Sequence, residues 1–261
     1  MANNTQIDSV AVTGGSIPTG DLGFIRNYKG HVDATSNYRI EDPSLEMSVC
    51  APFQQEADQE GGSEFPRLVA SPGDTITATY TENGHISKPE AADAVPGDIF
   101  WFGTTETMSG DSIPTLKEVM EWTADGSGGN GKGFKMSGAT DFDDTRCIED
   151  NGTPIALQRQ PAQACQSSFR LPQDIDSEHL TVFWVWDFSA KLGIAAAETH
   201  TEWYTSCMDF VMKSDTAATQ NVPTTEAPSS NDSVLQAAPG SNENSRRSLV
   251  YRSAKFAAAL W

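Results

Sequence analysis

Short segments in which apolar and polar residues alternate are the clearest pattern along this chain. Residues 75–80 (Thr-Ile-Thr-Ala-Thr-Tyr) are β-branched or aromatic with a period of two, which predicts a strand with one buried face. Residues 98–104 and 180–188 are apolar on both faces, which predicts buried strands, the second of them central in its sheet. Residues 7–12 and 117–123 are predicted to form two further strands.

Helical periodicity is scarce, and turn residues separate the predicted strands. The dipeptide Asn83-Gly84, for example, follows one strand directly and is a strong turn signal. Short strands joined by Gly, Pro and Asp turns predict an all-β fold, namely an immunoglobulin-like or fibronectin-like β-sandwich with long loops, over residues 1–213. Residues 214–261 are rich in Ser, Thr, Asn, Ala and Pro, and we expect them to form a disordered, low-complexity tail because they can bury little apolar surface.

A further strand is predicted around residues 202–211, and its two faces differ in chemistry. Side chains alternate between the faces of a strand. Glu202 and Tyr204 therefore share one face with His200, whereas Trp203 and Cys207 lie on the other. One face would carry titratable groups while the other anchors a disulfide in a core.

Charge and cysteine content narrow the class of protein. The net charge of −19 argues against nucleic-acid binding, which depends on neutralising phosphates. Four widely spaced cysteines predict two disulfides and an oxidising compartment, and three pairings are possible. We expect a secreted protein whose leader lies outside this sequence, because residues 1–9 lack the apolar segment of a signal peptide. No run of eighteen apolar residues predicts a membrane span.

Two motifs point to chemistry that their context does not support. Residues 126–132 match G-x-x-x-x-G-K, but Gly133 stands where a phosphate-binding loop needs Ser or Thr, so a flexible hairpin loop is predicted. The acidic group Asp141, Asp143 and Asp144 lacks the offsets of a calcium loop, and we expect solvated loop acids.

His85, directly after a turn, is well placed for a ligand. Three N-glycosylation sequons begin at Asn3, Asn151 and Asn231.

Several of these segments together resemble a known family. They are Gly73-Asp74, Glu82-Asn83-Gly84-His85, Asp141-Phe142-Asp143-Asp144 before Cys147, Phe183-Trp184-Val185-Trp186-Asp187, and Glu202-x-Tyr204-x-x-Cys207-Met208-Asp209. They look like a family of secreted fungal proteins that is similar in turn to the lytic polysaccharide monooxygenases. The resemblance covers roughly residues 7–212.

The resemblance implies a copper site of the histidine-brace type. In those enzymes an N-terminal histidine and a second histidine hold the copper, and a tyrosine is axial. The resemblance makes His85 the second brace ligand, Tyr204 the axial residue and Glu202 the group that orients the oxygen species. Imidazole suits copper. The family also implies disulfides Cys50–Cys207 and Cys147–Cys165.

The sequence departs from this pattern at its beginning, where Asn4 stands in the place of the expected histidine. We therefore expect copper-dependent oxidative cleavage of a polysaccharide only if a natural N-terminal histidine is restored. The alternative is a non-catalytic relative that binds a polysaccharide (cellulose, chitin or another wall glucan) and has lost the brace. A third hypothesis is a structural extracellular domain carried on a Ser/Thr-rich stalk. In each case we expect a monomer.

Overall fold

The computed structural model describes residues 7–14, 21–30, 38–57, 64–88, 96–188 and 201–213, and the statements below concern these residues. The predicted tail at 214–261 lies outside them, as do Asn4 and His200. The boundary between domain and tail therefore stays a prediction. None of the helices in the described ranges is long and apolar enough to cross a membrane.

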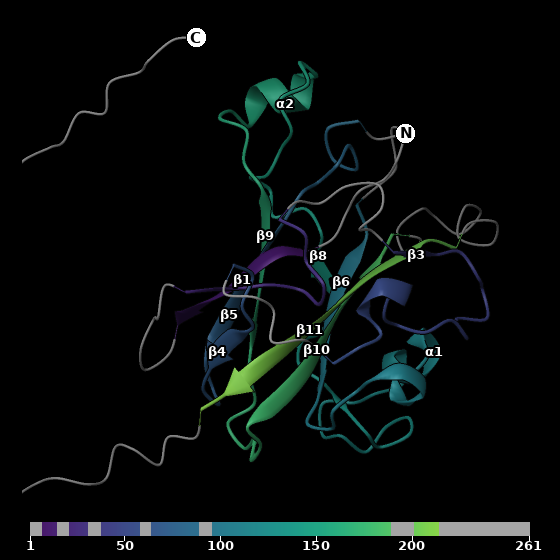
Figure 1. Ribbon diagram of the computed structural model, residues 1–261. Helices are drawn as coiled ribbons and strands as arrows, with labels where there is room; N and C mark the ends of the chain where they lie inside the picture. Colours follow the sequence, from purple (N-terminus) through teal and green to yellow (C-terminus); the bar gives the residue numbers. More distant parts are fainter. Residues whose placement is uncertain are drawn as a thin grey trace, which may run out of the picture. The chain divides into compact units, whose positions relative to one another are not determined.

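Two β-sheets form the molecule (Figure 1). The first sheet has the order β2-β1-β5-β9, and its strands are β1 (Ile7–Gly14), β2 (Leu22–Gly23), β5 (Thr75–Tyr80) and β9 (Cys165–Arg170). The second has the order β3-β11-β10-β6-β7, with β4 beside β11 and β8 beside β6. Its strands are β3 (Arg39–Ile40), β4 (Leu68–Ala70), β6 (Asp98–Thr104), β7 (Phe134–Lys135), β8 (Thr140–Asp141), β10 (His179–Asp187) and β11 (Trp203–Met212).

The strongest predicted strands are confirmed. In β5 burial alternates residue by residue, as its period of two requires. Strand β10 is buried along most of its length and lies between β11 and β6, antiparallel to both, so its central position is confirmed (Figure 1). Pairing with β11 sets Trp186 opposite Tyr204.

The second sheet buries apolar side chains on both of its faces. One core lies between the two sheets and includes Trp101, Trp184 and Tyr204. The other lies on the opposite face, beneath loops and a short helix, and includes Phe183 and Cys207. Tyr204 and Cys207 thus face opposite cores, as the alternation along β11 predicts. The all-β sandwich is the observed fold.

One predicted strand is wrong. Residues 117–123 do not form a strand, because the helix α1 (Leu116–Met120) occupies the beginning of this segment. The hydroxyl of Thr115 accepts a hydrogen bond from the backbone N–H of Glu118, and the Glu118 carboxylate accepts one from the N–H of Thr115. This reciprocal capping box starts a helix, and Leu116 and Val119 then fall on one buried face. The remaining helices are α2 (Pro154–Gln158) and the 3₁₀ turns Pro52–Gln54 and Gly110–Ser112.

The Gly-rich loop at 126–132 is not a hairpin either, since it leads from α1 into β7. The indole N–H of Trp122 donates to the side chain of Asn130 at 2.9 Å. A Cβ at position 133 would lie 2.2 Å from the Trp122 ring, so only glycine fits there. Gly133 is therefore explained by packing on Trp122.

Both disulfides implied by the family resemblance are confirmed. Cys50 and Cys207 are joined across 157 residues, and Cys147 and Cys165 across 18. The first ties β11 to the loop before the first 3₁₀ turn. The second closes the segment that carries α2.

Candidate functional site

His85 lies in a tight turn directly after β5. Asn83 and Gly84 adopt positive φ angles of 46° and 82°, the left-handed conformation that Asn and Gly tolerate best. The N–H of His85 donates to the carbonyl of Glu82 at 3.0 Å. The turn signal in the sequence is therefore confirmed, and the turn directs His85 towards the end of β10.

Aromatic rings surround the imidazole of His85. The ring centroids of Trp186 and Phe188 both lie 4.7 Å from that of His85, Tyr204 lies at 6.0 Å and Phe142 at 6.4 Å. The Nε2 atom of His85 is buried and has no hydrogen-bond partner among the described residues. Burial lowers the pKa of His85 to about 4, against the opposing charges of Glu202 and Glu82. The imidazole is thus neutral at pH 7, the form that binds metals.

Tyr204 and Glu202 form a buried pair beside this ring. The hydroxyl of Tyr204 donates to the carboxylate of Glu202, and both side chains are buried. The Tyr204 ring stacks on Trp186 with centroids 4.7 Å apart. Arg39 Nη1 lies 4.0 Å from Glu202 Oε1, and the Arg39 side chain is 41% exposed. The pair is therefore buried, and the partly exposed Arg39 lies next to it.

The structure thus brings His85, Tyr204 and Glu202 together from the ends of two distant strands. His200, predicted on the same face, lies outside the described residues. His179, at the opposite end of β10 from Trp186, bonds through Nε2 to the hydroxyl of Thr181 at 2.9 Å. All four cysteines are in disulfides, so none is a metal ligand.

A copper ion fits part of this arrangement. A neutral imidazole with an unpartnered nitrogen is a suitable copper ligand, and His85 provides it. Across the described ranges the only other histidine is His179, which is at the other end of β10. The described residues therefore offer a single imidazole at this site. The histidine brace stays a prediction, and the sequence has Asn4 where the resemblance expects its other histidine.

Sequence reasoning missed three residues of the site. Phe142 and Phe188 complete the aromatic wall around His85, and Glu82 anchors its turn. The spacing of Glu82, three residues before His85, is visible in the sequence. Its burial is not, because the groups that cover it come from other parts of the chain.

The acidic group before Cys147 has a structural role, so its prediction as solvated loop acids is wrong for two members. Asp144 accepts hydrogen bonds from the N–H groups of Cys147 and Gln166, at 2.7 and 3.0 Å. Asp143 forms a two-pronged ion pair with Arg159 at 2.6 and 2.8 Å. These carboxylates lie close to Cys147, but its sulfur is in a disulfide, so this group offers no thiolate to a metal ion.

Of the predicted sequons, one falls within the described residues. The Nδ2 atom of Asn151, which would carry the glycan, is buried. In this conformation Asn151 does not expose the atom to which a glycan would be attached. The sequons at Asn3 and Asn231 lie outside the described residues.

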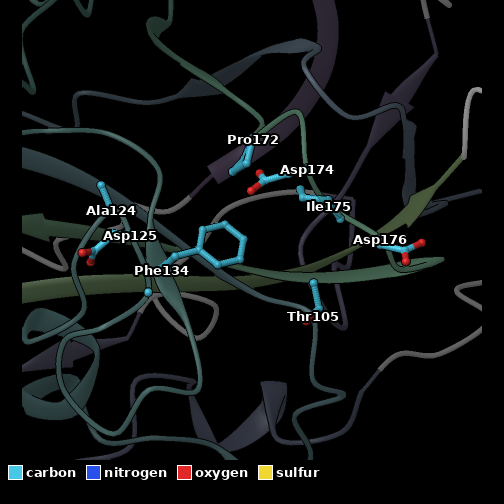
Figure 2. A pocket seen from close by; sticks show the side chains of 9 residues that line it. Thr105, Ala124, Asp125, Phe134, Pro172, Asp174, Ile175 and Asp176 are labelled. Atoms are coloured by element: carbon cyan, nitrogen blue, oxygen red, sulfur yellow. The ribbon is translucent and has the colours of Figure 1, made fainter.

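A pocket of about 330 Å³ lies near the C-terminal end of β6, next to Thr105. Figure 2 shows the ring of Phe134 in its middle, with Asp125 on one side and the turn that carries Asp174 and Asp176 on the other. Hydrogen bonds from Thr123 and Ser127 lower the pKa of Asp125 to about 2. That carboxylate is therefore already engaged in its own loop. The other two acids are exposed, and nothing in the pocket singles out a ligand.

Comparison with solved structures finds similarity to polysaccharide monooxygenases. A cellulose-active polysaccharide monooxygenase from M. thermophila is 15% identical, with 80% of this chain and 78% of that chain covered and a TM-score of 0.34. The extended catalytic domain of LPMO9A from H. jecorina is 11% identical (80% and 74% covered, TM-score 0.39), and CvAA9A is 18% identical (80% and 78% covered, TM-score 0.38). At these TM-scores the likenesses carry no conclusion about chemistry.

Comparison with the curated proteins finds no match. The family model that matches the chain is described as a domain of unknown function (DUF7492), and it matches residues 6–239. This span is most of the sequence. The chain therefore belongs to the DUF7492 family.

Proposed function

We propose that this chain is a secreted, lytic polysaccharide monooxygenase-like protein in which His85 provides one imidazole ligand for copper. Oxidative cleavage of a polysaccharide would require a natural N-terminal histidine as the second arm. The observation that carries the proposal is the buried Nε2 of His85, which has no hydrogen-bond partner in the part of the chain that the structure describes. Leaving a buried polar nitrogen unpaired has a cost in stability, and a ligand would remove it.

The surrounding residues suit this role. The aromatic wall keeps His85 neutral at pH 7, so its nitrogen lone pair is free to bind a metal. Tyr204 lies next to it, and its hydroxyl is held by Glu202. Glu202 thereby fixes the tyrosine and places a proton acceptor close to the site. Copper, when bound, would supply the one-electron oxygen chemistry that no side chain can supply.

The alternative function is non-catalytic binding of cellulose, chitin or another wall glucan. The observation that favours it is that the part of the chain described by the structure offers a single imidazole at this site, together with Asn4 in the sequence. One imidazole and a buried tyrosine would bind copper weakly. The aromatic and acidic residues around His85 would then stabilise the fold and take no part in catalysis.

The first test is the N-terminal residue of the protein that its natural source secretes, followed by titration with Cu(II). Two proteins are compared: the full chain, and an Asn4→His variant cleaved so that residue 4 comes first. We expect the cleaved variant to bind Cu(II) at least 100-fold more tightly than the full chain. We expect His85→Ala to abolish this gain and His179→Ala to leave it unchanged.

Two results would contradict the copper proposal. One is equal Cu(II) affinity with and without His85, and the other is equal loss with His179→Ala. Retention on insoluble cellulose or chitin is then measured for the same proteins. Retention that is independent of His85 supports the non-catalytic alternative, and release of oxidised oligosaccharides by the cleaved variant supports the enzyme.

A further inference from the structure

Glu82 is a buried carboxylate that binds three backbone N–H groups. Its Oε2 accepts from Ile86 at 2.8 Å and from Ser87 at 3.2 Å, on the far side of the turn that carries His85. Its Oε1 accepts from Glu149 at 3.1 Å. Only 2% of its surface is exposed. These N–H donors replace the hydrogen bonds to water that the carboxylate loses on burial.

The bond to Glu149 links the turn to a segment 67 residues away in the sequence. A second contact runs in the opposite direction, because the Glu149 carboxylate accepts from the backbone of Asn83. The Glu149 segment is itself fixed. It follows the disulfide Cys147–Cys165, and the carbonyl of Cys147 accepts a hydrogen bond from Arg159 at 3.2 Å. Hydrogen bonds in both directions therefore join the turn of His85 to the Glu149 segment, which is itself held by a disulfide and by Arg159.

Strand β5 offers a matched case at its other end. Asp74, also buried, closes the turn before β5 by accepting from the N–H of Ser71 at 2.8 Å, and its carbonyl accepts from Leu171. Both carboxylates order a turn beside the same strand. Only the turn of Glu82 carries a side chain with a buried, unpartnered nitrogen. Asp74 and Glu82 thus both order a turn, but only the turn ordered by Glu82 contains a candidate metal ligand.

We propose that Glu82 is a positioning residue: it fixes the turn of residues 82–87 so that the His85 imidazole is held in its aromatic wall, with Nε2 as the atom that a metal ion would bind. This inference rests on the proposed function, in which His85 is a metal ligand. Residues that orient a ligand from behind typically change metal affinity by about 10- to 100-fold when they are altered. Glu82 acts through the backbone and does not touch the metal.

The test compares Glu82→Gln with Asp74→Asn in the full chain. The amide of Gln can accept at one atom only, so at least one of the three N–H groups loses its acceptor. Three quantities are measured: the melting temperature, nuclear Overhauser effects between the rings of His85 and Trp186, and Cu(II) affinity by titration with electron paramagnetic resonance. We expect both variants to melt earlier. Only Glu82→Gln should lose the ring contacts, with about tenfold weaker Cu(II) binding and an altered copper spectrum.

Each outcome decides the question. If Glu82→Gln keeps the ring contacts and binds Cu(II) within twofold of the unaltered chain, the positioning role is wrong. It is also wrong if Asp74→Asn weakens Cu(II) binding equally. If the unaltered chain binds no Cu(II), the proposed function fails, and the ring contacts alone still decide whether Glu82 positions His85. Should Glu82→Gln not fold, Glu82→Asp keeps the charge, shortens the side chain and allows the same comparison.

Discussion

A histidine lies beside buried groups at each end of β10, and the two histidines differ in their hydrogen bonding. At the first end, His179 bonds to Thr181, whose hydroxyl donates to Asp209 at 3.0 Å. Asp209 also holds Arg26 through two bonds of 2.8 Å. At the second end, beside Trp186, His85 faces aromatic rings, and none of the described residues forms a hydrogen bond with its Nε2.

This difference separates a structural histidine from a candidate ligand. Around His179 the polar side chains bond to one another, so the network stabilises the fold and has no need of a ligand. Around His85 the apolar wall removes water without replacing its hydrogen bonds. A buried nitrogen without a hydrogen-bond partner costs free energy, and binding of a ligand to it would offset this cost. The comparison therefore predicts that changes at the first end alter stability and that changes at the second alter pH dependence and binding.

The largest expected effect is at the His179 end. Asp209→Asn should lower the free energy of unfolding by about 3 to 5 kcal/mol, because Arg26 would remain charged and fully buried without its counter-ion. Urea denaturation at pH 7 measures this. The double variant Arg26→Met with Asp209→Leu removes both charges, and we expect it to recover much of the loss. Equal destabilisation in both proteins would show that shape, and not charge, holds this end.

The next effect concerns pH and belongs to the His85 end. The pKa of His85 is about 4 in the folded chain and 6.5 in the unfolded chain, so between these values only the unfolded chain takes up the proton. Stability therefore falls as the pH falls from 6.5 to 4, by about 2 to 3 kcal/mol from this residue. In His85→Asn this part of the loss should be absent. Urea denaturation at pH 7 and at pH 4.5 measures the difference.

His179→Gln is the control for that experiment. Burial also lowers the pKa of His179, but Asp209 opposes the shift. We expect this variant to retain most of the pH dependence of the unaltered chain. If it removed more of that dependence than His85→Asn, the contrast between the two ends would be wrong.

Sequence predicted the strands better than the site. Periodicity located β5, β6 and β10, because burial on one or both faces leaves a direct pattern in the residues. It failed at α1, where the reciprocal bonds of Thr115 and Glu118 start a helix. The capping signal lies in the four-residue segment Thr115–Glu118, and apolar patterning over so short a segment does not distinguish helix from strand.

For the candidate site, the sequence placed Glu202 beside Tyr204 because both are on one face of a strand. It could not show that His85 lacks a hydrogen-bond partner, since this depends on which residues surround it after folding. Nor could it show the role of Glu82, whose partner Glu149 is distant in the sequence. The disulfide pairing came from the family resemblance, because spacing alone allows three pairings.

The smallest effect tests the pair beside His85. Tyr204→Phe removes the hydroxyl that donates to Glu202 and leaves a buried carboxylate with one donor fewer, while the ring still stacks on Trp186. We expect a loss of about 1 to 2 kcal/mol in the free energy of unfolding at pH 7, measured by urea denaturation. No measurable loss would mean that this hydrogen bond does not stabilise the fold, and the pair would then have no part in the contrast between the two ends of β10.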